Sequence, residues 1–195
     1  MSISKTVLFA SFLFFALFSV SAHAADCSNG GRYENNSDGT ATDCRTGLIW
    51  LLNANCNEVI NGVNGGPPIG WSPAHKWTSG LADGLCGLFD GSSAGDWRLP
   101  TKTEFMAMIT YAKNHGMTDP TLTNGAGTGH WTTLDVFTFV QSDNYWTSTN
   151  ASNATDVWII NMFNGALYSI PKIYGSYVWP VRGGQSGSVG SLFVE

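Results

Sequence analysis

Charged side chains are scarce in this sequence of 195 residues, because only 12% of them are Asp, Glu, Lys or Arg. Basic residues are the rarer kind, with 9 Lys and Arg against 14 Asp and Glu, and the formal net charge is -5. Proteins that bind nucleic acids, anionic membrane surfaces or sulfated polysaccharides usually present clustered basic residues. The composition therefore argues against these three classes of partner.

Long apolar runs are also missing, apart from Val7–Val20 near the start, which is shorter than the roughly 20 residues that span a bilayer. This run follows Lys5 and precedes the small-residue motif Ala22-His23-Ala24, an arrangement typical of a cleaved signal peptide. We expect cleavage after Ala24 and no membrane span in the mature protein; an uncleaved anchor is the alternative. The expected organisation is a signal peptide over residues 1–24, one domain over 25–184 and a flexible tail rich in Gly and Ser over 185–195.

Only four cysteines are present, and none of them forms a Cys-X-X-Cys pair or is accompanied by a pair of histidines, so a zinc site is not indicated. Export to an oxidising compartment favours disulfides instead. Cys27 and Cys44 bracket a predicted hairpin, and Cys56 and Cys86 bracket the segment that follows. We predict these two sequence-local bonds, with crossed pairing left open, and neither a metal nor another cofactor.

Motifs of catalysis are missing as well. No Gly-X-Ser-X-Gly nucleophile elbow occurs, and the glycine-rich run at residues 125–129 is not followed by the Lys-Ser/Thr of a phosphate loop. A hydrolase is conceivable on composition alone, built from Ser148, an aspartate and one of the histidines His75, His115 and His130. We predict that the protein is not an enzyme, and the hydrolase is the less favoured alternative.

The sequence does contain a corner with strong local signals, from Gly95 to Phe105. Pro100 biases the residue before it towards extended angles, Thr101 can cap a helix, and Glu104 can complete a capping box. Apolar residues then recur at helical spacing, which predicts a helix with one buried face. That face is expected to hold Phe105, Met108, Ile109 and Ala112. The residues that define the corner are Trp97, Arg98, Leu99, Pro100, Thr101 and Glu104.

Turn and cap signals predict further elements. Asp38-Gly39 favours a hairpin over residues 32–43, and an apolar strand follows at 46–51. Residues 53–70 are rich in Asn and Gly and are expected to form a long loop. Ser72-Pro73 favours the start of a helix, with Ser72 as its cap. The apolar face of that helix is expected to hold Ala74, Trp77, Leu81 and Leu85. Further strands are expected at 145–149 and 177–182.

A second hairpin is predicted around Asn164-Gly165, a dipeptide that strongly favours a two-residue turn. With that turn Asn161 lies opposite Tyr168, and opposed residues share one face of a sheet. The face assigned to the core carries Trp158, Ile160, Met162 and Leu167. The other face carries Ile159, Asn161, Phe163, Tyr168 and Ile170. This mixture of polar and aromatic residues is typical of recognition surfaces, so we predict that these five residues bind a ligand. The alternative is that a loop covers them.

Several segments, in this order, resemble one bacterial family. They are Asp38-Gly39-Thr40, residues 46–50, 53–56 and 86–88, the corner at 95–101, and residues 145–149 and 177–184. Together they are similar to the C-terminal domain family of the Legionella collagen-like adhesin. The Trp-Arg-Leu-Pro-Thr, Trp-Thr-Ser-Thr and Val-Trp-Pro-Val-Arg segments also resemble the C-type-lectin-like scaffold. Formylglycine-generating enzymes share that scaffold with the variable ligand-binding proteins of diversity-generating retroelements.

The resemblance implies an α+β fold, with two helices beside a twisted, mostly antiparallel sheet and with long loops. It also implies an exported, non-catalytic binding or adhesion module that is secreted, periplasmic or on the cell surface. Its partner would be an extracellular protein or a glycan. In the variable proteins an exposed hairpin near the C-terminus binds the ligand, and this corresponds to Asn161, Tyr168 and their neighbours.

Departures from these relatives narrow the expectation. The sequence has no Gly-X-Y repeat of the kind that trimerises the namesake, and no Glu-Pro-Asn or Gln-Pro-Asp signature of calcium-dependent lectins. No cysteine follows Cys86, whereas formylglycine-generating chemistry needs redox-active cysteines late in the domain. Two alternatives remain: a structural, homo-oligomeric subunit of a cell-surface assembly and, less favoured, an enzyme on the formylglycine-generating type of scaffold.

Overall fold

A computed structural model describes residue 27 and residues 30–183 of the chain. The predicted signal peptide (1–24) and tail (185–195) lie outside the described residues. Two helices and mostly antiparallel strands make up the described part, so the predicted α+β class is confirmed. Neither of these helices is long and apolar enough to cross a bilayer. The C-type-lectin-like scaffold stays a prediction.

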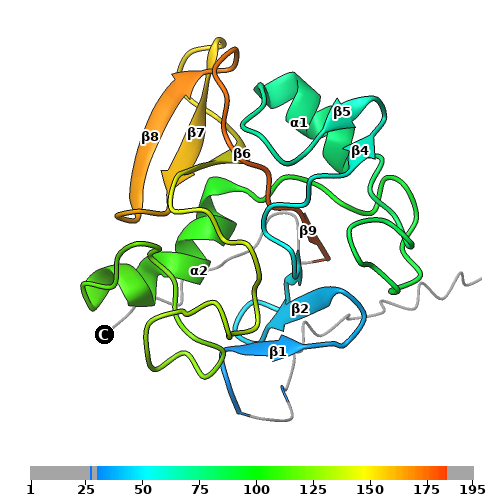
Figure 1. The fold of residues 1–195 in the computed structure, drawn as a ribbon. Helices are drawn as coiled ribbons and strands as arrows, with labels where there is room; N and C mark the ends of the chain where they lie inside the picture. Colours follow the sequence, from blue (N-terminus) through cyan, green and yellow to red (C-terminus); the bar gives the residue numbers. More distant parts are fainter. Residues whose placement is uncertain (1–26, 28–29, 184–195) are drawn as a thin grey trace, which may run out of the picture.

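The first sheet joins the beginning of the described chain to its end. Its strand order is β1-β2-β3-β9, with every neighbouring pair antiparallel. The strands are β1 (Tyr33–Asn35), β2 (Thr40–Asp43), β3 (Ile49–Leu51) and β9 (Val181–Arg182). β1 and β2 form the hairpin predicted around Asp38-Gly39 and lie at the lower end of the molecule in Figure 1. Asp38 Oδ1 accepts hydrogen bonds from the Thr40 amide and hydroxyl, which closes the turn.

The second sheet has three antiparallel strands in the order β6-β7-β8. They are β6 (Asn144–Asn150), β7 (Asp156–Asn161) and β8 (Ala166–Pro171). Figure 1 shows this sheet above helix α2 (Lys102–Asn114), with β8 as its outermost strand. A small third sheet of β4 (Val59–Ile60) and β5 (Val63–Asn64) lies beside helix α1 (Trp71–Thr78). The long loop predicted at 53–70 therefore contains a short hairpin.

Helix α2 starts with the predicted capping box. The Thr101 amide donates to Glu104 Oε2 at 2.6 Å, and the Glu104 amide donates to Thr101 Oγ1 at 3.2 Å. These bonds satisfy two of the amides that a helix start leaves without partners. The four residues predicted for the apolar face are all buried. The capping box and the buried apolar face predicted for the corner from Gly95 to Phe105 are confirmed.

Helix α1 differs from the prediction at both ends. Its N-cap is Gly70, with no side-chain cap, rather than Ser72, and the helix ends at Thr78. Asn61 Nδ2 donates to the Lys76 carbonyl, and a Cβ at Gly80 would lie 2.3 Å from the same nitrogen. Only a residue without a Cβ fits at position 80 beside Asn61. The predicted apolar residues Leu81 and Leu85 lie beyond the helix, although Leu81 is still fully buried.

Five fully buried tryptophans fill the core: Trp50, Trp77, Trp97, Trp146 and Trp179. Trp179 is at the centre of this group, because its ring centroid lies 5.3 Å from that of Trp50 and 5.0 Å from that of Phe137. Both contacts are edge-to-face, the arrangement that the charge distribution of aromatic rings favours. Its Nε1 also donates to the Leu51 carbonyl at 2.8 Å. Residues from three distant parts of the chain are thereby packed together.

The two disulfides pair as predicted from sequence proximity. Cys27 bonds Cys44 and Cys56 bonds Cys86, with Cα–Cα distances of 5.6 and 5.7 Å. None of the four cysteines is left as a free thiol. In the chain-entropy view, closing a loop of about 30 residues stabilises the fold by about 3–4 kcal/mol. The second bond therefore fastens the segment between β3 and the corner, which contains little regular structure.

The register of the β7–β8 hairpin differs from the prediction by two residues. Asn161 pairs with Ala166 instead of Tyr168, so the turn contains four residues, 162–165. Backbone amides of Asp119 and Thr121 donate to the carbonyls of Phe163 and Met162. A distant segment therefore occupies the Phe163 carbonyl, which a two-residue turn would have placed in the ladder. Because side chains alternate with a period of two, this shift leaves the predicted division into two faces unchanged.

Candidate binding surface

The residues predicted to bind a ligand on the β7–β8 hairpin do not share one environment. Phe163 and Tyr168 are 51% and 47% exposed. Asn161 and Ile170 are half-buried, and Ile159 is only 1% exposed. A ligand at the surface cannot contact the Ile159 side chain, so that part of the prediction is wrong.

A distant segment covers the part of the sheet that holds Ile159. Ile159 pairs with Trp146 of β6, so their side chains lie on the same face. Trp146 Nε1 donates a hydrogen bond to the Ile69 carbonyl at 2.6 Å, and Ile69 is bridged to Ser176. The chain that leads into α1 therefore lies against this face. For Ile159, the alternative prediction that a loop covers this face is therefore correct.

The Asn161 side chain is used inside the protein. Its Nδ2 donates to Asn144 Oδ1 at 2.8 Å, and its Oδ1 accepts from the Asn164 amide at 3.3 Å. Asn164 Oδ1 in turn accepts from the Ala166 amide at 3.0 Å. These side-chain amides close the four-residue turn and join it to β6. Asn161 therefore supports the hairpin, and the prediction that its side chain is presented to a ligand has no structural support.

Two exposed residues that were not predicted extend the accessible part of the hairpin. Ile173 is 86% exposed and Tyr174 is also exposed, and both lie in the turn that follows β8. The sequence carried a signal for them, because apolar residues between Pro171 and Gly175 stand where a turn would normally be polar. We call Phe163, Tyr168, Ile173 and Tyr174 the hairpin rim.

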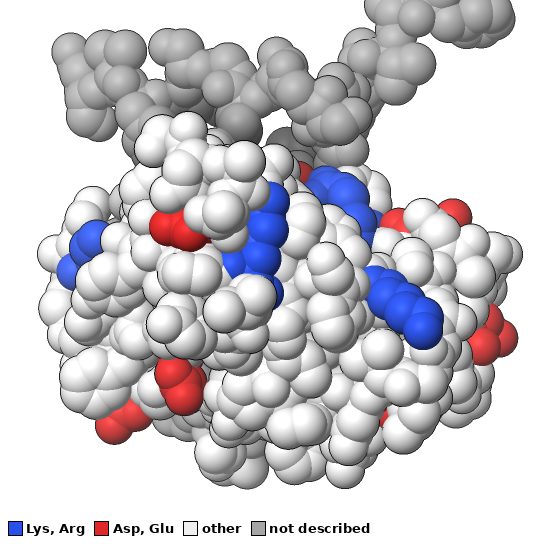
Figure 2. Space-filling view, turned by 90° about the horizontal axis from the view of Figure 1, so that it is seen from above, with Lys and Arg blue, Asp and Glu red and all other residues white. Residues whose placement is uncertain are grey.

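The sequence of the hairpin is uncharged from Val157 to the end of β8. Residues 157–171 contain no Asp, Glu, Lys or Arg. Lys172 is the nearest basic residue in sequence, and its Nζ lies 4.7 Å from the Trp71 ring and donates to the Ala154 carbonyl. Figure 2 shows a face of the molecule on which charged side chains are scattered over a largely uncharged surface. The side chains of the hairpin rim offer aromatic and apolar contacts, and two charged residues of other segments, Asp119 and Lys113, lie beside the turn that holds Phe163.

The corner residues are occupied in holding the fold. Arg98 donates to both carboxylate oxygens of Glu104, at 2.9 and 2.7 Å. Burial alone would raise the pKa of Glu104, but the hydrogen bonds from Arg98 and from Thr101 outweigh it and hold the pKa below its ordinary value. Trp97 Nε1 donates to Ser92 Oγ, and Leu99 is fully buried. These side chains position β9 and α2.

Ser148 and the histidines of the described chain lie in separate environments. Ser148 Oγ donates to the Pro100 carbonyl at 3.3 Å. His75 packs against Trp71 at 4.2 Å between ring centroids, and burial together with the positive charge of Lys172 lowers the pKa of His75. The remaining two contact carbonyl groups, His115 at Tyr111 and His130 at Pro120. No hydrogen bond joins Ser148 to any of these three histidines.

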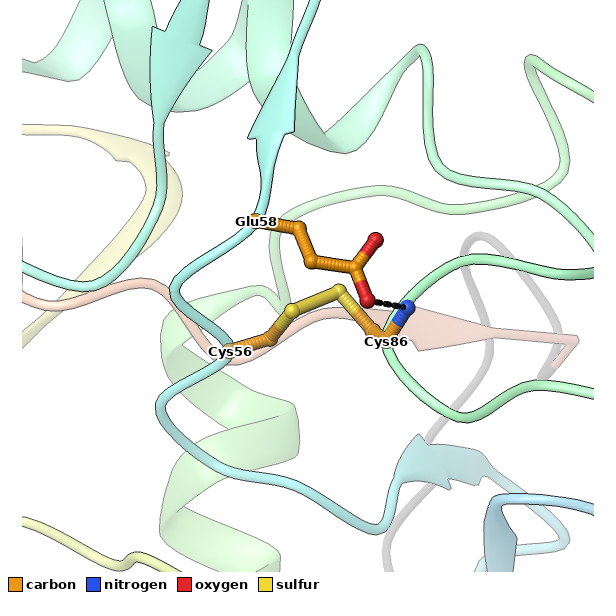
Figure 3. Close-up of side chains that lie close together, drawn as sticks. All are labelled: Cys56, Glu58 and Cys86. Carbon is orange, nitrogen blue, oxygen red and sulfur yellow. Dashed lines mark hydrogen bonds between the residues drawn. A yellow bond between two sulfur atoms is a disulfide. The ribbon is translucent and has the colours of Figure 1, made fainter.

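One cluster has the residue types of a metal site. Cys56, Glu58 and Cys86 bring two sulfurs and a carboxylate oxygen within 4.8 Å of one another. Figure 3 shows that the two sulfurs are bonded to each other and that Glu58 Oε1 accepts a hydrogen bond from the Cys86 amide at 2.9 Å. Thiolates are the form of cysteine that binds metals, and a disulfide has none. The disulfide and the Glu58 hydrogen bond therefore hold the segment around Cys86 in place, and the two sulfurs are not available as thiolate ligands.

Comparison with known proteins identifies the family. The Lcl C-terminal domain model matches residues 39–182, most of the chain, so the chain belongs to the Lcl C-terminal domain family. Comparison with curated proteins gives no significant match. The predicted resemblance to this family is confirmed, and the chain is an adhesin-related module. Together with the two disulfides, this membership fits an extracellular or cell-surface protein.

Proposed function

We propose that this protein is an exported, non-catalytic binding module that recognises an extracellular protein or glycan through the hairpin rim. The ligand would contact Phe163 and Tyr168 on the hairpin and Ile173 and Tyr174 in the turn after it. Of the five residues predicted from the sequence, the proposal retains Phe163 and Tyr168 as direct contacts. Ile170, which is half-buried on the same face, would lie behind them.

The distribution of exposed apolar residues carries this proposal. Eight large apolar side chains are exposed among the described residues, and four of these form the hairpin rim. Of the other four, Leu134 and Phe139 lie on one loop, and Val59 and Phe89 lie on separate segments. The four residues of the hairpin rim lie along β8 and in the turns at its two ends, and a concentration of exposed apolar side chains on one element is typical of interaction sites, whereas single ones are ordinary. Tyrosine in particular combines a large contact area with a polar hydroxyl.

Two further observations support a binding role without catalysis. In the described chain, no hydrogen bond joins the serine from which a hydrolase could be built to any of the three histidines. Each of the four cysteines is held in a disulfide, so the chain offers no free thiol for the redox chemistry of formylglycine-generating enzymes. Secretion into the periplasm or transfer to the cell surface would both suit this role.

A binding experiment tests the proposal. The mature, oxidised chain is applied to arrays of glycans and extracellular proteins, and the ligand identified is titrated against Phe163→Ala/Tyr168→Ala. Loss of two aromatic contacts is expected to weaken binding at least about tenfold. The variant should unfold within a few degrees of the wild type, since both side chains are exposed.

The matched control removes exposed apolar side chains from another part of the surface. Leu134 is 95% exposed, and Phe139 is exposed on the same loop. Leu134→Ala/Phe139→Ala should bind as the wild type does. Unchanged binding by the hairpin variant, or equal losses in both double variants, would remove the hairpin rim as the recognition surface.

A further inference from the structure

Strand β8 forms a free edge of the β6-β7-β8 sheet. The opposite edge, β6, is paired with another segment, because the Trp146 amide donates to the Tyr177 carbonyl and the Tyr177 amide donates to the Asn144 carbonyl. In the first sheet the amide of Tyr33 on β1 donates to the Gly125 carbonyl. In the described chain β8 pairs with β7 alone, and Figure 1 shows it as the outermost strand of its sheet.

The register shows which backbone groups of β8 point outwards. The Lys172 amide donates to the Thr155 carbonyl, so the pair Asp156–Pro171 is of the non-hydrogen-bonded kind. The two kinds of pair alternate along an antiparallel ladder. Tyr168 therefore exchanges hydrogen bonds with β7, whereas the amide and carbonyl groups of Leu167 and Ser169 point away from it. No backbone hydrogen bond in the described chain uses the groups of Leu167 or Ser169 outside this ladder.

Among the residues that the structure describes, nothing gives this edge the usual protection against pairing. Natural proteins protect edge strands with charged side chains, bulges or a covering segment. β8 has the sequence Ala-Leu-Tyr-Ser-Ile-Pro, with no charged residue, and its six pairs with β7 run without a register shift. Its one protective residue is Pro171, which lacks an amide proton and ends the run. Leu167 and Ser169 are thus a short, uncharged template for another strand.

We propose that β8 pairs with β8 of a second copy of this chain, antiparallel and about a twofold axis at Tyr168. The two three-stranded sheets then form one continuous six-stranded sheet. Leu167 and Ser169 lie on either side of Tyr168, so each copy offers the other a matching pair of donors and acceptors. Two Leu167–Ser169 pairs form, each exchanging two hydrogen bonds.

The residues around the axis suit a second copy better than an unrelated strand. Tyr168 faces its own counterpart in a non-hydrogen-bonded pair, the kind in which side chains lie closest. Phe163 precedes Tyr168 by five residues and Ile173 follows it by five, so the axis brings the exposed Phe163 of one copy towards the exposed Ile173 of the other. The same register places Lys172 opposite Asn164, so no like charges are opposed.

The inference goes beyond ligand binding and does not depend on it. Isologous pairing is the commonest symmetry among soluble oligomers. A dimer of this kind leaves the face of the sheet accessible and places two Tyr168 side chains next to each other on it. A ligand with repeated units would then contact both copies.

The test uses the mature, oxidised chain and its Ser169→Pro and Ser169→Ala variants. The amide of Ser169 points outwards, so proline at this position removes an intermolecular donor while leaving the β7–β8 ladder intact. Alanine keeps the donor. Sedimentation velocity over a range of concentrations should show a monomer–dimer equilibrium for the wild type and Ser169→Ala. Ser169→Pro removes two of the intermolecular bonds and should weaken association about 10- to 100-fold.

Two measurements keep the proposal falsifiable if the proline variant misfolds. Hydrogen exchange at the Leu167 and Ser169 amides of the wild type should be fast in dilute samples and slow as the dimer forms. Tyr168→Cys should cross-link into a covalent dimer on mild oxidation, whereas Leu134→Cys should not.

Three results would overturn the proposal. The first is a wild type that stays monomeric at every concentration reached. The second is association that Ser169→Pro leaves unchanged. The third is slow exchange of both amides in the dilute monomer, which would mean that the outward groups of β8 are already bonded within one chain. Any of these results would leave ligand binding by the hairpin rim untouched, since that is measured by titration at low protein concentration.

Discussion

The corner at Gly95–Phe105 and the β7–β8 hairpin are both rich in aromatic residues, yet different kinds of contact fix them. In the corner, Thr101 and Arg98 bond Glu104 within a stretch of a few residues. In the hairpin, the register and the covered part of the face depend on distant segments that contain Asp119 and Ile69. Local contacts thus make the buried support, and long-range contacts decide which aromatic side chains remain available to a partner.

The sharpest way to test this difference is to remove one aromatic ring from each region. Trp97 is buried, donates from Nε1 to Ser92, and lies beneath Arg182. Trp97→Ala should lower the free energy of unfolding by about 3–5 kcal/mol, because it leaves a large cavity. Phe163→Ala should change it by less than about 1 kcal/mol, since that ring is half exposed. Denaturant unfolding measures both, and equal losses would contradict the distinction.

The helix cap tests whether local hydrogen bonds hold the corner. Thr101→Ala removes the side-chain acceptor of the capping box and should cost about 1 kcal/mol of unfolding free energy. Thr103 is exposed two residues later on the same helix, and Thr103→Ala is the matched control. That control should be neutral or slightly stabilising, because alanine is the better helix former. A neutral Thr101→Ala would show that the cap contributes nothing measurable.

In the hairpin, two residues predicted together from the sequence should separate in their effects. Asn161→Ala breaks the hydrogen bond to Asn144 and one bond within the turn, and should cost about 1 kcal/mol of unfolding free energy. Tyr168→Ala should leave stability within about 0.5 kcal/mol of the wild type and weaken only ligand binding. Thermal unfolding and ligand titration of both variants check this. Similar behaviour of the two would contradict their different placement.

The smallest expected effect concerns pH. The pKa of Glu104 is lower in the folded protein than in the unfolded chain, so its stabilising contribution is fully present above the ordinary carboxyl pKa, about 4.3. It is lost as the pH falls through the folded pKa, because the folded form then takes up the proton as well. Glu104→Gln should therefore be less stable than the wild type at neutral pH, and the difference should narrow in acid. Because the Arg98–Glu104 ion pair is partly exposed to solvent, the difference in stability between the two proteins should be less than about 1 kcal/mol.

Features that depend on local contacts could be predicted from the sequence, and features that depend on long-range contacts could not. The capping box, the apolar face of α2 and the two disulfides depend on residues that are close in sequence or on simple pairing, and all were predicted correctly. A helix was correctly predicted where α1 lies, but with Ser72 rather than Gly70 as its cap and with an apolar face that extends past its end at Thr78 to Leu85. Asn61 donates to the Lys76 carbonyl in its last turn and lies against Gly80. The contact with Asn61 cannot be predicted from the hydrophobic periodicity of the helix.

The candidate site was predicted only in part, for a physical reason. Alternation along β7 and β8 correctly divides the residues into two faces, but it does not say how far each face is covered. Ile159 and Tyr168 are paired across the hairpin on the same face, and the loop before α1 buries one and leaves the other exposed. Burial of this kind depends on a contact between distant segments, which the local pattern cannot contain.

The most direct test of the recognition surface is a hydrogen-exchange footprint of the array-identified ligand on the mature chain, recorded at a protein concentration where the chain is monomeric. Ligand-induced protection is expected at residues 163–174, with the loop that carries Leu134 and Phe139 unchanged. Protection confined to that loop, or to the segment around Phe89, would contradict the assignment of recognition to the β7–β8 hairpin.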